Sequence, residues 1–250
     1  EIIPAGPRGI PARVVDSIYR RWLARSRPVF EYHPGSRYVI NSGFTARLFE
    51  EAHQVRLPVV YPPMQIPPCD FQPEDLSRRD TLTFFSRINP KKRPEMVLEL
   101  AKRYPELRCL IMGAVSPNRQ GYFQQLQRRA QEEKLSNVVF SPSLPLSAVR
   151  TELARTRFYI FPAIDEHFGI TTVEAIAAGA VPYVHDSGGQ REIVPDPRLR
   201  FTDATFLSGF EKLLELPQAE LNSIRQSLSR GLQNFSEEAY IEKMLAYLDA

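Results

Sequence analysis

FPAIDEHFGITTVE, residues 161–174, sets the architecture of this 250-residue chain. Its first residues are apolar and predict the end of a buried strand, the polar residues around Glu166 predict a loop, and helical spacing begins near Ile170. A strand, a short loop and a helix in this order form half of a βαβ unit. We therefore expect a parallel sheet covered by helices, with this loop at the carboxyl edge of the sheet.

The same alternation extends in both directions from this stretch. From residue 81 onward, short apolar runs alternate with amphipathic segments, as in consecutive βαβ units. The predicted strands are residues 81–86, 107–113, 137–141, 157–163, 181–186 and 199–202. The predicted helices are residues 94–103, 119–133, 146–156 and 171–178, followed by terminal segments 204–216 and 219–248, the second broken near 234–236. Right-handed crossovers make this an α/β, Rossmann-like domain.

The first 75 residues follow a different pattern. They contain a basic amphipathic stretch at 13–27, one predicted strand at 38–41, a predicted helix at 45–53 and a Pro-rich segment at 58–73 that suits a linker. A second doubly wound domain needs roughly 100 residues or more. We therefore expect an incomplete N-terminal domain with its linker in residues 1–74, a Rossmann-like domain in 75–234 and a C-terminal helix in 235–250.

Composition excludes several classes of protein. The chain is 43% hydrophobic and 24% charged, and its net charge of +3 comes without the basic, aromatic-rich stripe of nucleic-acid binders. No apolar run approaches the ~18 residues of a membrane span. Cys69 and Cys109 lie far apart, which indicates neither a disulfide framework nor a zinc site and favours a reducing, cytoplasmic location. The first residue is Glu1 rather than methionine, as expected of an excerpt or a processed protein.

Two carboxylates in the opening stretch suit a sugar ligand. Seven residues separate Glu166, in the loop, from Glu174, which we expect in the first turn of the helix. Carboxylates accept hydrogen bonds from sugar hydroxyls, and the free amides of a helix N-terminus bind phosphate. Gly169 permits a close approach there. Because such a spacing is common by chance, its meaning depends on the surrounding pattern.

That surrounding pattern resembles a known family. The glutamates, followed by AIAAGAVPYVHDSGG at residues 175–189, resemble the donor motif of the family 4 retaining glycosyltransferases, which have the GT-B fold. The resemblance implies that Glu166 contacts the transferred sugar near its anomeric carbon and that Glu174 binds the ribose. It also implies donor contacts from the next four residues, through the backbone in the last three: His167, Phe168, Gly169 and Ile170. An alternative for His167 is a loop histidine without a ligand.

A second segment, FFSRINPKKRPEMVLELA at residues 84–101, resembles the family's strand, basic loop and helix. The resemblance implies that Arg87 and Lys92 clamp the diphosphate and act in catalysis. Fixed cations can stabilise the charge that develops on a departing diphosphate. No Asp-x-Asp occurs in the chain, so we expect no metal and no cofactor beyond the donor. The alternative is a solvated basic turn, because Lys91 and Arg93 are neighbours.

Other positions match the family less specifically. Gly113, Ser143 and Leu144 correspond to positions near the nucleotide base, although glycine after a strand and polar loop residues are also ordinary turn chemistry. YVINSGFTARLFEE at residues 38–51 and VVYPPMQ at 59–65 resemble the last strand and helix of the first domain and the hinge. The resemblance covers residues 38–248. It implies that residues 1–74 are a remnant of the acceptor domain and that 75–234 bind the nucleotide sugar.

Within the family, Glu-His-Phe-Gly-Ile and Tyr-Pro-Pro are most similar to mannosyltransferases that build lipid-linked oligosaccharides from GDP-mannose. The resemblance implies transfer of mannose, with retention, to a sugar or lipid-linked acceptor. Alternatives are a UDP-sugar-dependent glucosyl- or N-acetylglucosaminyltransferase, a GT-B epimerase, and a nucleotide-sugar-binding module without activity. Residues 13–27, with Trp22 on the apolar face, suit either a helix packed on the first domain or a peripheral contact with the cytoplasmic face of a membrane.

Overall fold

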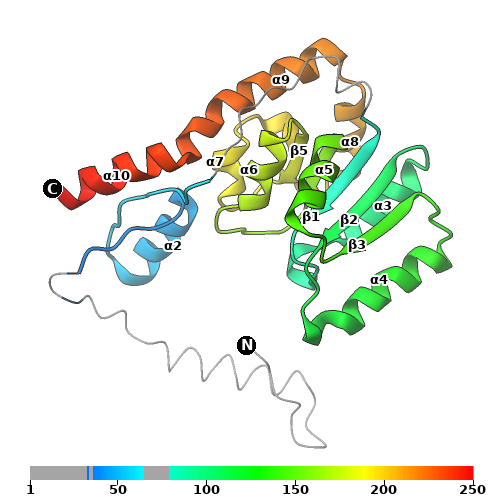
Figure 1. Ribbon diagram of the computed structural model, residues 1–250, viewed down its shortest axis with the longest axis horizontal. Coiled ribbons are helices and arrows are strands. Elements are labelled where there is room, and N and C mark those ends of the chain that lie inside the picture. Colours follow the sequence, from blue (N-terminus) through cyan, green and yellow to red (C-terminus); the bar gives the residue numbers. More distant parts are fainter. Residues whose placement is uncertain (1–32, 34–35, 65–78, 250) are drawn as a thin grey trace, which may run out of the picture. The chain divides into compact units, whose positions relative to one another are not determined.

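The computed structural model describes residues 33, 36–64 and 79–249 (Figure 1). All elements below belong to the compact unit Tyr38–Ala250. The amphipathic stretch at 13–27, with Trp22, and the thiol of Cys69 lie outside the described residues. No helix in the described part of the chain is long and apolar enough to cross a membrane.

The centre of the fold is one parallel sheet with the strand order β3-β2-β1-β4-β5-β6. Its strands are β1 Thr81–Phe85, β2 Arg108–Gly113, β3 Val138–Pro142, β4 Thr156–Phe161, β5 Val181–His185 and β6 Arg200–Phe201. Each strand coincides with a predicted one, and the order is that of a Rossmann fold. The direction of winding reverses between β1 and β4, which are neighbours. The loops that follow these two strands therefore leave the sheet side by side, where such folds bind ligands.

The helices of the described chain are α2 Gly43–His53, α3 Glu95–Arg103, α4 Gln120–Glu132, α5 Leu146–Arg155, α6 Ile170–Ala177, α7 Gln190–Ile193, α8 Phe206–Leu214, α9 Gln218–Gly231 and α10 Glu237–Asp249. Most of them lie against the sheet, whereas α2 and α10 lie to one side of it (Figure 1). Helix α3 packs on β2, α6 on β4 and β5, and α9 on both β5 and α6. The predicted helices are confirmed, and the predicted break in the last segment is the short 3-10 helix η5, Leu232–Phe235. The sequence pattern missed α7, because one turn is too short to show a helical period.

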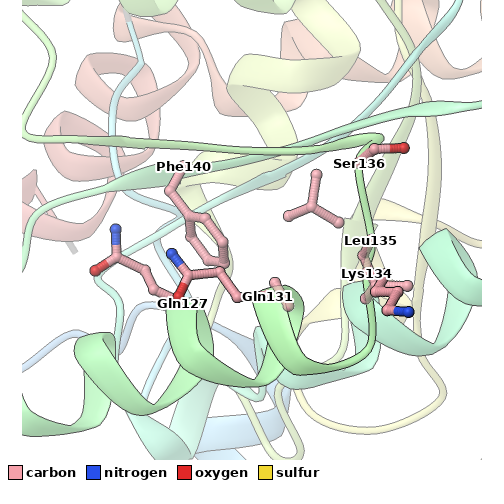
Figure 2. Close-up of a pocket in the computed structure, with 8 residues that line it drawn as sticks. Gln127, Gln131, Lys134, Leu135, Ser136 and Phe140 are labelled. Atoms are coloured by element: carbon pink, nitrogen blue, oxygen red, sulfur yellow. The ribbon is translucent and has the colours of Figure 1, made fainter.

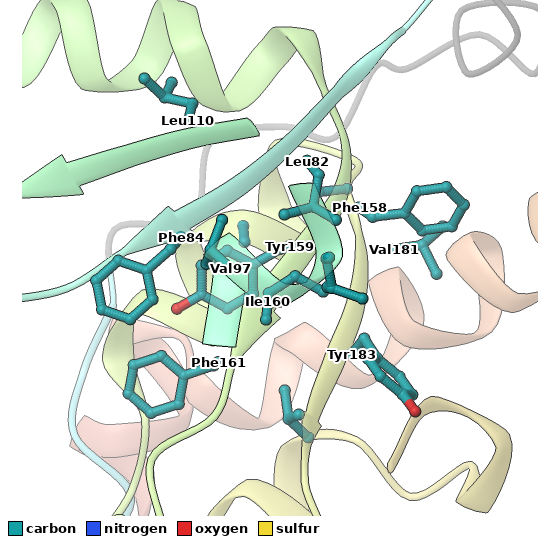
Figure 3. Packing of buried hydrophobic residues seen from close by; sticks show 14 of the residues in the cluster. Leu82, Phe84, Val97, Leu110, Phe158, Tyr159, Ile160, Phe161, Val181 and Tyr183 are labelled. Atoms are coloured by element: carbon teal, nitrogen blue, oxygen red, sulfur yellow. The ribbon is translucent and has the colours of Figure 1, made fainter. Parts of the chain in front are cut away.

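Strands β1, β2, β4 and β5 are buried along nearly their whole length, as expected of parallel strands with helices on both faces of the sheet. Figure 3 shows Phe84 and Phe161 with their rings close together, and the two ring centroids are 6.5 Å apart at an interplanar angle of 11°. Cys109 in β2 is fully buried and carries a free thiol. Burial raises the pKa of this thiol to about 12, so it behaves as a small apolar side chain.

The strand predicted at residues 38–41 is wrong. The backbone there forms a single bridge, between Ile40 and Val59. The Ile40 amide donates to the carbonyl of Pro58 at 3.0 Å, and the Val60 amide donates to the carbonyl of Ile40 at 2.9 Å. Proline at position 58 has no N–H with which to continue a ladder, so the pairing stops after one bridge.

Candidate functional site

The basic loop between β1 and α3 directs one of its cations into the carboxyl edge of the sheet. Asn89 caps the 3-10 turn η2, Pro90–Lys92, by accepting a bond from the Lys91 amide at 3.0 Å. Lys92 then extends over the ring of Phe161, 5.3 Å from its centroid, and forms an ion pair with the carboxylate of Glu166. The structure therefore brings together two residues that the sequence assigned to one site.

The neighbouring basic residues are arranged differently. Arg93 adopts a left-handed conformation with φ of 55° and donates to the carbonyl of Pro162 at 3.2 Å and to Asp203 at 2.7 Å. It thus holds the basic loop against the end of β4. Arg87 and Lys91 are both exposed. The basic loop is therefore more than a solvated turn, because two of its cations have specific partners.

The β4–α6 loop, residues 162–169, is fixed mainly through its backbone. The Asp165 amide donates to the hydroxyl of Ser187 at 2.8 Å, and the Gly189 amide donates to the carbonyl of Glu166 at 2.7 Å. The turn before α7 packs so tightly that a Cβ at Gly188, where φ is 68°, would lie 2.4 Å from the same carbonyl oxygen. Only glycine fits there, so the Gly-Gly pair after β5 shapes this loop.

The N-terminus of α6 faces the same edge of the sheet. Gly169 precedes it with φ of 113°, and no side chain caps the helix. The first amides of such a helix have no intrahelical acceptor and can bind an anion. Phe168 is buried, with its ring stacked on Tyr61 at 5.7 Å, so only its backbone can face a ligand. His167 and Ile170 are exposed.

Glu174 lies in the second turn of α6 rather than in the first, because the helix begins at Ile170. It lines a cavity of about 400 Å³ between α5 and α6, together with Leu146, Val149 and Arg150 among others. Burial raises the pKa of Glu174, and the positive charge of Arg150 opposes this rise. The carboxylate is thus partly desolvated and able to accept hydrogen bonds from a ligand in the cavity.

One buried phenol lies near both glutamates. Tyr159 in β4 donates to the Phe85 carbonyl at 3.2 Å and shares a 2.7 Å hydrogen bond with the hydroxyl of Thr171. Burial raises the pKa of Tyr159, and the negative charges of Glu174 and Glu166 raise it further. The phenol therefore stays protonated and ties the end of β1 to α6. Sequence reasoning missed this role, since an apolar strand pattern does not show where one hydroxyl points.

The residues predicted near a base lie at the ends of β2 and β3. Gly113 has φ of 144°, and a Cβ there would lie 1.7 Å from the carbonyl oxygen of Ser86. The Ser143 amide donates to the Gly113 carbonyl at 3.1 Å, so these two residues are adjacent. Leu144 packs against the hydrophobic core. Their contact with a base remains a prediction.

A second cavity lies away from these residues. It has a volume of about 420 Å³ and lies between α4 and β3 (Figure 2). Its lining is Gln127, Ala130, Gln131, Lys134, Leu135, Ser136, Val138 and Phe140. None of the residues singled out in the sequence lines it. In the described part of the chain, no three His, Cys, Asp or Glu side chains form a group able to hold a metal ion.

Sequence comparison finds a family and several relatives. Residues 70–202 match the family model described as "Glycosyl transferases group 1". The α-1,3/1,6-mannosyltransferase alg2 of Schizosaccharomyces pombe is 29% identical over 197 residues, which cover 64% of this chain and 39% of that protein. The GDP-Man:Man(3)GlcNAc(2)-PP-Dol α-1,2-mannosyltransferase of Caenorhabditis elegans is 26% identical over 243 residues, covering 83% of this chain and 51% of that protein. The chain thus spans about half or less of the length of these relatives.

Solved structures share the fold. The Anabaena protein Alr3699/HepE, crystallised with UDP and glucose, has a TM-score of 0.73 at 18% identity, over 96% of this chain and 68% of that chain. A glycosyltransferase from Rickettsia africae ESF-5 has a TM-score of 0.72 at 17% identity, over 98% of this chain and 68% of that chain. The predicted GT-B type of α/β fold is confirmed.

Proposed function

This chain belongs to the group 1 glycosyl transferases, and we propose that it carries the nucleotide-sugar site of a retaining hexosyltransferase. The main observation behind the proposal is the ion pair between Lys92 and Glu166. It joins the loops that follow the neighbouring strands β1 and β4. The uncapped N-terminus of α6 lies at the same edge. A cation, a carboxylate and free amides are the groups that a sugar linked to a diphosphate requires.

In the proposed reaction, an acceptor hydroxyl attacks the anomeric carbon of the donor sugar. The bond from that carbon to the diphosphate oxygen breaks, and the diphosphate leaves with the electron pair. Arg87, Lys92 and the amides at Gly169 and Ile170 stabilise the charge that develops. The hydroxyl proton passes to the departing oxygen on the same face of the sugar, which accounts for retention. Glu166 positions the hexose, and fixed cations serve in place of a metal.

The nucleotide extends from the diphosphate along the ends of the strands. Glu174 accepts hydrogen bonds from the ribose, in keeping with its place in the cavity between α5 and α6. Gly113, Ser143 and Leu144 lie beside the base, and His167 contacts the donor sugar. Residues 75–234 form the donor domain in this proposal, with 1–74 contributing part of the acceptor domain and 235–250 the closing helix.

The donor we propose is GDP-mannose, because the Caenorhabditis elegans relative is named for GDP-Man and the Schizosaccharomyces pombe relative is a mannosyltransferase. The acceptor is a sugar or lipid-linked sugar, since that first name includes a PP-Dol-linked glycan. This suits a cytoplasmic location, peripheral to a membrane. A UDP sugar is the rival donor, since a structure with the same fold holds UDP and glucose.

Calorimetric titration with GDP-mannose, GDP, UDP-glucose and UDP-N-acetylglucosamine tests the proposal. We expect GDP-mannose and GDP to bind, and Lys92→Ala to weaken GDP binding by roughly ten-fold or more, because the diphosphate loses a cation. Lys91→Ala is the matched control and should bind GDP like the wild type, because Lys91 has no part in the proposed donor site and its replacement removes the same charge from the same loop. Binding of UDP without GDP would overturn the mannose assignment. Binding of neither would overturn the donor site.

Turnover separates the enzyme from a binding module. With a lipid-linked mannose acceptor, we expect the chain or its longer parent protein to release GDP from GDP-mannose in step with glycan growth. Donor binding without turnover in the parent protein would favour the module instead.

A further inference from the structure

Glu192 is the one acidic residue of α7, and its carboxylate joins three segments of the chain. It accepts hydrogen bonds from the amides of Gly43 at 2.9 Å and Phe44 at 2.8 Å, which open helix α2. It also accepts one from the hydroxyl of Tyr61 at 3.0 Å. A carboxylate at a helix N-terminus satisfies free amides and interacts favourably with the helix dipole.

Tyr61 is suited to remain a donor in this arrangement. Burial raises its pKa to about 12, and the negative charge of Glu192 and the hydrogen bond to it contribute to the rise. The glycine at position 43 also matters, because a Cβ there would lie 3.3 Å from the Glu192 carboxylate. The surroundings are therefore shaped to receive the carboxylate of Glu192.

The segment that carries Glu192 supports one side of the β4–α6 loop. Ser187 accepts from the Asp165 amide, and the Gly189 amide donates to the Glu166 carbonyl. Gln190 is fully buried and accepts from the hydroxyl of Thr172 in α6 at 2.8 Å. Residues 187–192 thus hold both the loop and the helix that follows it.

Helix α2 supports the same loop from its own start. The hydroxyl of Ser42, which is fully buried, donates to the carbonyl of His167. The hydroxyl of Thr45 donates to the same carbonyl at 3.4 Å. The β4–α6 loop therefore contacts both residues 187–192 and the start of α2. Glu192 in turn joins residues 187–192 to α2, so that the three segments hold one another.

We propose that Glu192 is a positioning residue for the donor sugar, acting through the β4–α6 loop and touching no donor atom. By fixing α2 against α7, it fixes the backbone of Glu166 and His167 between them. Glutamine would keep one oxygen but would turn an amide N–H₂ toward a backbone N–H, leaving a donor facing a donor. This inference rests on the proposed function only for the identity of the ligand that binds at the loop.

Hydrogen–deuterium exchange of the ligand-free protein tests the coupling without any donor. In Glu192→Gln we expect the amides of Gly43 and Phe44 and those of residues 165–169 to exchange roughly five-fold or more faster, with β1 and β2 unchanged. Glu242→Gln, the same replacement at an exposed position of α10, is the control and should exchange like the wild type. Unchanged exchange at residues 165–169 in Glu192→Gln would overturn the inference.

Titration then tests the role in sugar positioning. Glu192→Gln should lose roughly ten-fold in affinity for GDP-mannose and clearly less for GDP, because Lys92 and Glu174, which lie outside residues 165–169, also hold the nucleotide. Glu192→Asp, which keeps the charge near α2, should recover part of the loss. An equal loss for GDP and GDP-mannose would show a general structural effect and overturn the positioning role. If Glu192→Gln does not fold, Tyr61→Phe removes one of the three bonds, and the same selective loss, smaller in size, is expected.

The proposed donor site and the proposed role of Glu192 can be refuted independently of each other. A wild-type protein that binds no sugar nucleotide refutes the proposed function, and the exchange experiment still decides whether Glu192 holds the loop.

Discussion

Lys92 and Glu166 form an ion pair whose side chains are only 13% and 20% exposed. A pair this far out of water is costly to break, because the partner that remains is left partly buried and uncompensated. An arriving diphosphate can share the ammonium of Lys92 without removing it from Glu166. In the proposed function, the same pair therefore holds Glu166 ready as an acceptor for sugar hydroxyls before the donor binds.

Glu174 gives a pH prediction at the residue scale. Burial raises its pKa, and only the ionised form accepts two ribose hydrogen bonds, so nucleotide affinity should fall as pH drops through the raised value. Glu174→Gln should lower affinity about ten-fold at neutral pH and remove this pH step. Titrations of GDP between about pH 5 and pH 8 measure both effects, and an identical pH profile in the variant would contradict the ribose role.

The ionisation of Glu174 should affect stability and nucleotide affinity in opposite directions. The folded state holds the proton of Glu174 more tightly than the unfolded chain, whose pKa is near the ordinary value of 4.5. Its contribution to stability is therefore complete below that value and is lost as pH rises through the raised pKa. A desolvated acid that weakens the free protein at neutral pH is typical of a binding site.

At the scale of elements, the site depends on where α6 begins and on what holds its other end. Helix α9 packs on α6, and its Arg225 is only 1% exposed. The Arg225 guanidinium donates to the Gly179 carbonyl at 2.7 Å, in the turn that follows α6, and to Asn222 at 3.2 Å. The helix that carries Glu174 is thus anchored at its C-terminal end by a buried charge-assisted bond.

Arg225→Ala should lower the free energy of unfolding by about 2–3 kcal/mol, because it removes this bond and leaves a cavity. Arg230→Ala, an exposed arginine of the same helix, is the control and should change stability by less than about 0.5 kcal/mol. Urea denaturation of the three proteins gives the comparison. Equal stability of the two variants would show that the anchor contributes little.

At the scale of the whole molecule, one buried histidine makes folding sensitive to mild acid. His185 at the end of β5 is 9% exposed and lies 2.9 Å from the hydroxyl of Ser187. Burial lowers its pKa below 6.5, and the nearby charges act in both directions: Asp203, Asp165 and Asp186 raise it, and Arg93 lowers it. The unfolded chain therefore takes up a proton at a higher pH than the folded protein does.

Stability from His185 should be present above about pH 6.5 and lost as pH falls through that value toward the lowered pKa. Thermal unfolding at pH 7.5 and 5.5 measures the loss, and in His185→Gln the difference between the two temperatures should shrink. An unchanged difference would assign the pH dependence to other groups.

Much of the fold could be predicted from local sequence patterns. The six strands and the long helices followed from hydrophobic periodicity, which depends on neighbours in sequence. Gly169 stood out in the sequence as a position of close approach, and the likeness of its surroundings to the family 4 glycosyltransferases placed the chain correctly. The strand at residues 38–41 was predicted wrongly, because pairing needs a partner that periodicity does not reveal.

Only the tertiary structure decided which distant residues meet. Lys92 and Glu166 are 74 positions apart, Ser42 and His167 are 125 apart, and Gly43 and Glu192 are 149 apart. Lys92 and Glu166 meet because the order of the strands brings the loops after β1 and β4 to one edge of the sheet. The other two pairs form because the start of α2 packs against the β4–α6 loop and α7. The sequence alone determined the six strands, the long helices and the family. The tertiary packing determined that α2 and α7 hold the β4–α6 loop between them, since such contacts leave no local periodic signal.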